Sequence, residues 1–61
     1  MNNAFDMDGY ELFPGDYVAC GKKLYRINKI NNVKDYSDLE LIHVKTTKIV
    51  KRKSFEVERL N

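Results

Sequence analysis

Residues 15–30 read GDYVACGKKLYRINKI, and this stretch decides the fold class. Two runs of β-branched, aromatic and aliphatic residues, 17–20 and 24–30, lie on either side of a short turn at Gly21. Such a pair of runs is typical of a β-hairpin. Further runs of this kind follow at residues 39–44, 48–51 and 55–60. The sequence therefore predicts an all-β fold.

The length of 61 residues indicates a single small domain. Within it we expect a barrel of about five short antiparallel strands over residues 13–60. Residues 1–12 carry acidic side chains and are predicted to form an irregular lead-in that packs on this barrel. A domain of this size buries only about 60% of the surface of its unfolded chain. A partner protein or a homodimer interface could therefore contribute to its stability.

The second run predicts a bent strand. Leu24, Ile27 and Ile30 are three positions apart, so a flat strand cannot place all of them on one face. A bulge or bend can do so, and such bends help to close small barrels. In the first run, alternation places Val18 and Cys20 together, which predicts that Cys20 is a free thiol in the core.

Residues 38–45 allow two interpretations. Ser37 followed by Glu40 matches a helix capping box. The β-branched residues Ile42 and Val44 favour a strand instead, and we adopt that interpretation. Strands at 39–44 and 48–51 would carry apolar residues on both faces. Their outer side should then be covered by a second molecule or by the lead-in residues Phe5, Met7, Leu12 and Phe13.

Charge is segregated along the chain although the net charge is only +2. Residues 1–20 contain acidic but no basic side chains, whereas the blocks 22–34 and 45–53 are strongly basic. In one interpretation, neighbouring strands of opposite charge form ion pairs across the sheet. In the other, the two basic blocks lie side by side and attract nucleic acid or an acidic protein.

The sequence gives no support for catalysis, a metal or a cofactor. Asp6-Met7-Asp8-Gly9 resembles the first signature of haloacid dehalogenase-type phosphatases. Tyr10 stands where that family has threonine, however, and the remaining chain is too short for its doubly wound domain. We interpret these residues as a turn in which Asp side chains bind local backbone. Cys20 and His43 are too few for a four-ligand zinc site.

Localisation is predicted from the cysteine content and the lack of membrane segments. One cysteine excludes an intramolecular disulfide and fits a reducing compartment. No apolar run approaches the roughly 20 residues of a membrane helix. We therefore expect a cytoplasmic protein without a membrane partner.

From Gly15-Asp16-Tyr17-Val18 to the basic, isoleucine-containing run 24–30, the chain resembles SH3-like small barrels of the KOW and Tudor type. The resemblance covers about residues 13–60 and implies a binding module without catalysis. Abundant Asn, Lys, Ile and Tyr, with little Ala, Gly or Pro, resemble the style of small bacteriophage accessory proteins.

Two binding functions are predicted. The first is docking on a larger protein, such as a host enzyme or defence complex that the module inhibits or modulates. Its candidate residues are Tyr25, Tyr36, Ile42, Val44 and Val50. The alternative is nucleic-acid binding through basic strands that also carry aromatic residues. Its candidates are Lys22, Lys23, Arg26, Lys29, Lys48, Lys51, Arg52 and Lys53.

Overall fold

The computed structural model describes residues 4–33 and 36–60, which fold almost entirely as strands. In chain order these are β1 (Ala4–Phe5), β2 (Glu11–Leu12), β3 (Tyr17–Cys20), β4 (Lys23–Asn32), β5 (Ser37–His43), β6 (Ile49–Lys53) and β7 (Glu58–Arg59). A short 3-10 helix, η1 (Ser54–Glu56), connects β6 to β7. The all-β prediction is confirmed. The alternative helix at residues 38–45 is wrong, because most of that segment belongs to β5.

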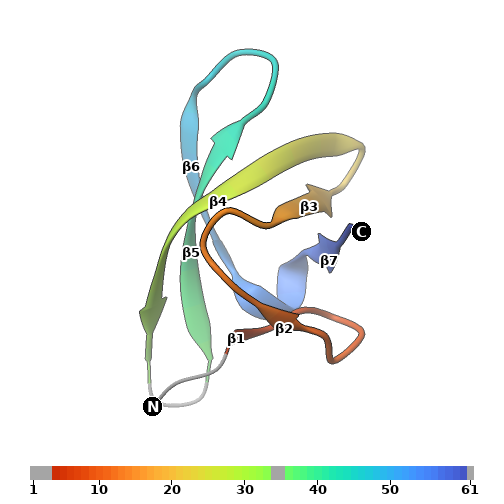
Figure 1. Cartoon of the computed structure of the whole chain (residues 1–61), viewed down its shortest axis with the longest axis vertical. Coiled ribbons are helices and arrows are strands. Elements are labelled where there is room, and N and C mark those ends of the chain that lie inside the picture. Colours follow the sequence, from red (N-terminus) through yellow and green to blue (C-terminus); the bar gives the residue numbers. More distant parts are fainter. Residues whose placement is uncertain (1–3, 34–35, 61) are drawn as a thin grey trace.

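The strands form two antiparallel sheets (Figure 1). β1 and β2 pair as a small hairpin, while the larger sheet has the order β6-β5-β4-β3-β7. β4 is the longest strand and bends across the molecule (Figure 1). Within the two described ranges, β6 and β7 do not pair with each other. Over these residues the larger sheet therefore stays open, with β6 and β7 as its edges, and does not close into the predicted barrel.

The predicted bend in β4 is confirmed as a β-bulge at Asn28. Ile27 lies opposite Leu41, whereas Lys29 lies opposite Glu40, so Asn28 is an extra residue in the ladder. Two successive side chains consequently point outward, and Ile27 and Ile30 both face the core. Leu24 does not join them. Its side chain is 40% exposed on the outer face of the sheet.

The core lies on the concave, inner face of the larger sheet. Its buried residues are Ala4, Leu12, Val18, Tyr25, Ile27, Leu39, Leu41 and Val57, with Cys20, Ile30 and Val50 partly buried against them. Cys20 is thus a free thiol beside the core, as expected, although it is half-buried rather than fully enclosed.

Two candidate docking residues face this core, which corrects their predicted place on the surface. Tyr25 is only 4% exposed, because alternation with Leu24 turns its ring inward. Val50 lies opposite Leu41 and packs against the core cluster. Tyr25 is therefore not available as a surface anchor, and Val50 is half-buried on the inner face.

The lead-in packs on the larger sheet as predicted, but it is not irregular. Ala4 of β1 and Leu12 of β2 are both buried in the core. The N–H of Met7 donates to the carbonyl of Val57 at 3.0 Å. The hairpin therefore closes the core near η1 and β7 (Figure 1). The side chains of Phe5, Met7 and Phe13 stay exposed, and they leave the outer side of β5 and β6 uncovered.

Asp6 fixes the turn of this hairpin. One carboxylate oxygen accepts the N–H groups of Asp8 at 2.9 Å and Tyr10 at 2.8 Å, and the other accepts the N–H of Arg59 at 2.6 Å. Burial disfavours the charged carboxylate, but these donors and the N–H of Gly9 outweigh it and lower the pKa of Asp6. The interpretation of this acidic segment as a backbone-binding turn is confirmed for Asp6.

Candidate docking surface

Four apolar side chains form a continuous patch on the outer face of the sheet. The N–H of Val44 donates to the carbonyl of Leu24 at 3.1 Å, which places these two residues opposite each other. Ile42 lies two residues before Val44, on the same face, and its partner across the ladder is Ile49. We call Leu24, Ile42, Val44 and Ile49 the outer patch.

Most of the outer patch is exposed to solvent. Leu24 is 40% exposed, Val44 44% and Ile49 61%, while Ile42 is half-buried between its neighbours. Scattered apolar residues on a surface are normal, and these adjoining ones on one sheet face make the patch a candidate contact site.

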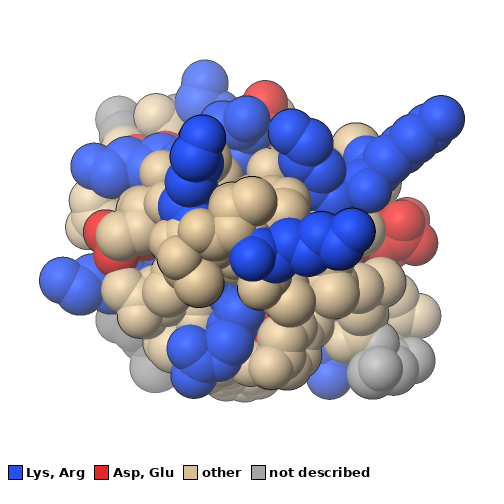
Figure 2. Space-filling model, turned by 90° about the horizontal axis from the view of Figure 1, so that it is seen from above, with Lys and Arg blue, Asp and Glu red and all other residues tan. Residues whose placement is uncertain are grey.

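Basic residues lie on the outer face beside this patch or in the turns and strand ends next to it, although alternation turns Lys23 and Lys48 toward the other face of the sheet. One comes from the turn between β3 and β4, two from the turn between β5 and β6, two from β4 and one from β6. This basic rim comprises Lys22, Lys23, Arg26, Lys45, Lys48 and Lys51. Figure 2, which views the molecule from the β5–β6 turn, shows Lys and Arg side chains around a central area of other residues.

None of the rim cations forms an ion pair within 4.0 Å with a carboxylate of the described residues. Across residues 4–33 and 36–60, the ion pair found joins Arg59 Nε to Asp16 Oδ2 at 4.0 Å, away from the rim. Cross-strand ion pairs are therefore not formed by the rim, although Glu40 does lie opposite Lys51 in the ladder. Glu40, which stands between Lys29 and Lys51, accepts a hydrogen bond from Asn28 Nδ2 at 2.7 Å instead.

A hollow of about 470 Å³ opens at one side of the outer patch. It is lined by Lys22, Lys23, Leu24, His43, Val44 and Lys45. His43 fixes the turn that lines this hollow, because the Nδ1 atom of His43 accepts the N–H groups of Lys45 at 3.2 Å and Thr46 at 3.1 Å. The His43 ring also packs edge-on against Tyr25, with ring centres 5.2 Å apart.

The predicted basic face is only partly formed. β5, with Asp38 and Glu40, runs between β4 and β6, so the two basic blocks do not lie side by side along their length. They meet at the turns, where Lys22 and Lys23 approach Lys45 across the hollow. Lys34, at the end of the first block, lies outside the described residues.

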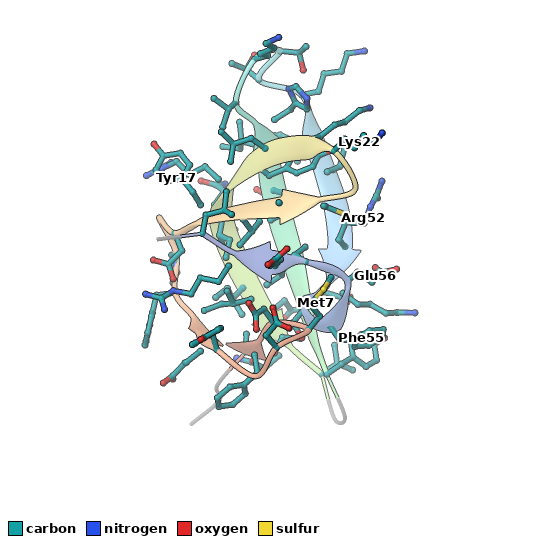
Figure 3. The ribbon with its side chains drawn as sticks, turned by 90° about the vertical axis from the view of Figure 1, so that its right-hand side faces the viewer. Met7, Tyr17, Lys22, Arg52, Phe55 and Glu56 are labelled. Carbon is teal, nitrogen blue, oxygen red and sulfur yellow. The ribbon has the colours of Figure 1, made fainter. Side chains whose placement is uncertain are left out.

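Of the remaining candidate cations, Lys29 lies on the outer face opposite Glu40, and the other two lie elsewhere. Arg52 is paired with the buried Leu39, so it projects from the opposite face of β6 to Lys51. Lys53 Nζ lies 5.4 Å from the centre of the Tyr36 ring, which in turn packs edge-on against Phe55. Figure 3 shows that Tyr17 points to the opposite side of the molecule from Lys22 and Arg52.

Of the predicted docking residues, the structure brings Ile42 and Val44 together and separates them from Tyr36. Leu24 and Ile49 complete the patch, although sequence reasoning did not select them. Ile49 could have been predicted as a surface residue, because alternation places it on the opposite face of β6 from Val50. Leu24 was misplaced because only the ladder shows that Tyr25 is the inward residue.

The described residues contain no cluster of three or more His, Cys, Asp or Glu side chains that could hold a metal ion. Nor does the described part of the chain include a helix long and apolar enough to cross a membrane. Comparison with protein-family models, curated proteins and solved structures found no match to this chain.

Proposed function

We propose that this protein is a non-catalytic module that docks on an acidic surface of a larger protein. The observation that carries the proposal is the outer patch, an exposed apolar surface beside cations that form no ion pair with described carboxylates. A partner with an apolar anchor and surrounding Asp and Glu residues would bury the patch and neutralise the rim. Such complementarity speeds association and selects the partner.

The apolar patch favours a protein over nucleic acid as the main partner. Phosphate backbones are held by cations and need no exposed aliphatic residues. Leu24, Val44 and Ile49 would remain in water in a complex that used only the rim. Burial of apolar area contributes about 25 cal/mol per Å². A protein that covers this patch therefore gains more binding free energy than a ligand that contacts only the rim.

We also propose that the fold is an open variant of the SH3-like small barrel of the KOW or Tudor type. The strand order β6-β5-β4-β3-β7 and the 3-10 turn before the last strand support this assignment. The residue usage supports an origin among bacteriophage accessory proteins, with a host enzyme or defence complex as the partner. The free thiol of Cys20 is compatible with action in the cytoplasm.

Substitution of the outer patch tests the docking function. Ile42→Thr combined with Ile49→Thr keeps strand-forming residues but removes apolar surface. We expect a partner captured from a bacterial host to bind this variant at least about tenfold more weakly, as for the loss of a hot-spot contact. The matched control is Phe13→Thr, because Phe13 is 54% exposed but lies away from the patch.

Thermal melts must show that all variants fold. Equal partner binding by the folded double variant and the control would refute the docking proposal.

Nucleic-acid binding is kept as a second candidate function because Lys22, Lys23 and Lys45 surround one hollow. If phosphate is the ligand, affinity for a single-stranded oligonucleotide should fall steeply with salt, and Lys22→Gln with Lys45→Gln should reduce the slope. Unchanged affinity in the double Thr variant would then assign binding to the cations alone.

A further inference from the structure

The outward edge of β6 carries backbone groups that the sheet does not use. In an antiparallel ladder, alternate residues direct both N–H and C=O toward the neighbouring strand. The N–H of His43 donates to the carbonyl of Lys48 at 2.8 Å, so the backbone groups of Lys48 and of every second residue after it face β5. Val50 and Arg52 therefore bond to β5, whereas the backbone groups of Ile49 and Lys51 point away from the sheet.

Two hydrogen bonds agree with this assignment of the outward-facing backbone groups. The N–H of Lys53, which should also point outward, donates to Glu56 Oε1 at 2.8 Å rather than to β5. The carbonyl of Lys51 accepts Arg52 Nη1 at 2.8 Å from an exposed side chain. Of the described residues outside the ladder, none hydrogen-bonds to the N–H or C=O of Ile49 or to the N–H of Lys51.

The opposite edge of the sheet is closed by the chain itself. The carboxylate of Asp6 accepts the N–H of Arg59 in β7, and the N–H of Met7 binds the carbonyl of Val57 just before it. The lead-in therefore covers β7. On β6, Glu56 caps the N–H of Lys53 at the end of the strand, while the N–H and C=O of Ile49 and the N–H of Lys51 have no partner among the described residues. This asymmetry leaves β6 as the edge on which another strand can be added (Figure 1).

The charges along β6 indicate what kind of strand fits. Ile49, Lys51 and Lys53 alternate on the outer face, and Arg52 lies on the other face. Exposed lysines on an edge strand discourage pairing with a like-charged copy. They attract an extended segment that carries acidic side chains opposite them and an apolar side chain opposite Ile49.

We infer that the partner contributes an extended acidic segment that pairs with β6 and lengthens the sheet. The inference rests on the proposed docking function and specifies how the partner is held. Backbone hydrogen bonds to Ile49 and Lys51 fix the added strand, and side chains on its outer face continue the surface of the outer patch. Main-chain bonds supply affinity and alternate side chains supply specificity in this mode of recognition.

Amide exchange with a synthetic probe tests the inference directly. The probe is a capped peptide that alternates Glu with Thr and Val, and its control replaces every Glu by Lys. In the free protein, we expect the amides of Ile49 and Lys51 to exchange faster than those of Val50 and Arg52. The acidic peptide should protect the Ile49 and Lys51 amides, and the basic peptide should not.

Two substitutions of Lys51 separate the contribution of its backbone hydrogen bond from that of its side-chain charge. Lys51→Pro removes an outward N–H and a charge, whereas Lys51→Thr removes the charge alone. Pro is tolerated where the N–H of an edge strand faces solvent. We expect Lys51→Pro to bind the acidic peptide about tenfold more weakly than Lys51→Thr, in line with the loss of one hydrogen bond. If Lys51→Pro does not fold, the amide protection in the unmodified protein decides.

Several results would overturn the inference. These are acidic-peptide binding without protection of Ile49 and Lys51, equal binding by folded Lys51→Pro and Lys51→Thr, or no binding of the acidic peptide. Protection that rises with protein concentration alone would assign the edge to a second copy, and protection by an oligonucleotide would assign it to nucleic acid. A captured partner that needs Ile42 and Ile49 but tolerates Lys51→Pro would keep the docking function and exclude strand addition.

Discussion

Asp6 is the residue on which the lead-in turn depends. The residue is 5% exposed, and its carboxylate accepts backbone N–H groups from both its own turn and β7. A local turn is thereby tied to a strand near the other end of the chain. A buried carboxylate in such an arrangement stabilises the fold only while it is ionised.

We expect Asp6→Asn to lower the free energy of unfolding by about 1–3 kcal/mol at neutral pH, as for lost hydrogen bonds to a charged group. The pKa of Asp6 in the folded protein lies below its ordinary value of 3.8. Its contribution is thus complete above that value and is lost as pH falls through the lower folded-state pKa. Urea denaturation at several pH values should show the difference from the unmodified protein shrinking in acid.

The control for Asp6 is Asp8→Asn, because the Asp8 side chain is exposed. This variant should unfold much like the unmodified protein at neutral pH. Equal effects of the two substitutions would show that burial and the three N–H contacts of Asp6 have no special role.

Thr47 is held in an unfavourable backbone conformation by the β5–β6 turn. Its φ is 60°, in the left-handed region that β-branched residues avoid. The N–H of Thr47 donates to the carbonyl of His43 at 2.7 Å, which keeps this conformation in place. Glycine adopts the same φ without steric cost.

Thr47→Gly should therefore stabilise the protein by a few tenths to about 1 kcal/mol, since relief of strain exceeds the added entropy of the unfolded chain. Thr46→Gly is the matched control, because Thr46 does not have a positive φ and should lose stability on substitution. Thermal melts would show opposite shifts in Tm. A lower Tm for Thr47→Gly would contradict the expectation.

Among the strands, β4 can follow the curvature of the sheet without a break because it contains a bulge. Asn28 is the extra residue, and it places two successive side chains outside the core. Bulges increase local twist and bend the strand that carries them. Ile27 and Ile30 then reach the same core from positions before and after the bend.

Deletion of Asn28 would leave Ile27 and Ile30 on the inner face but would straighten β4. We expect a loss of about 1–3 kcal/mol, the usual cost of forcing the backbone around a packed core to shift. Asn28→Thr keeps the bulge and removes only the exposed hydrogen bond to Glu40, so it should cost less. Chemical denaturation of both variants measures the difference, and equal stabilities would show that the bend does not depend on the extra residue.

At the scale of the whole molecule, the lead-in is part of the folded unit. Leu12 is 2% exposed and Ala4 is 2% exposed, both within the one core cluster. The lead-in also caps β7 through Asp6 and Met7. A boundary between residues 12 and 13 would therefore cut through the core.

Two neighbouring residues test this view. We expect Leu12→Ala to cost about 2–5 kcal/mol, a large fraction of the stability of so small a domain. Phe13→Ala should have little effect, because the Phe13 side chain is 54% exposed. Comparable melting temperatures for the two variants would indicate that residues 13–60 fold without the lead-in.

The features that depend on local sequence patterns could be predicted before the structure was known. Alternation correctly placed Val18 beside the core and predicted β5 as a strand with Leu39 and Leu41 on one face. The three-residue spacing of Ile27 and Ile30 predicted the bulge. These inferences succeed because side-chain direction in a strand follows from the backbone of the strand itself.

Tertiary structure alone decided which surfaces those strands share. The sequence could not show that β5 separates the two basic blocks, because strand order depends on pairing between distant segments. It missed the lead-in hairpin, whose two-residue strands carry almost no periodic signal and are held by contacts to Val57 and Arg59. It also reversed Leu24 and Tyr25, since both are apolar and only the neighbouring strands determine which of them faces inward.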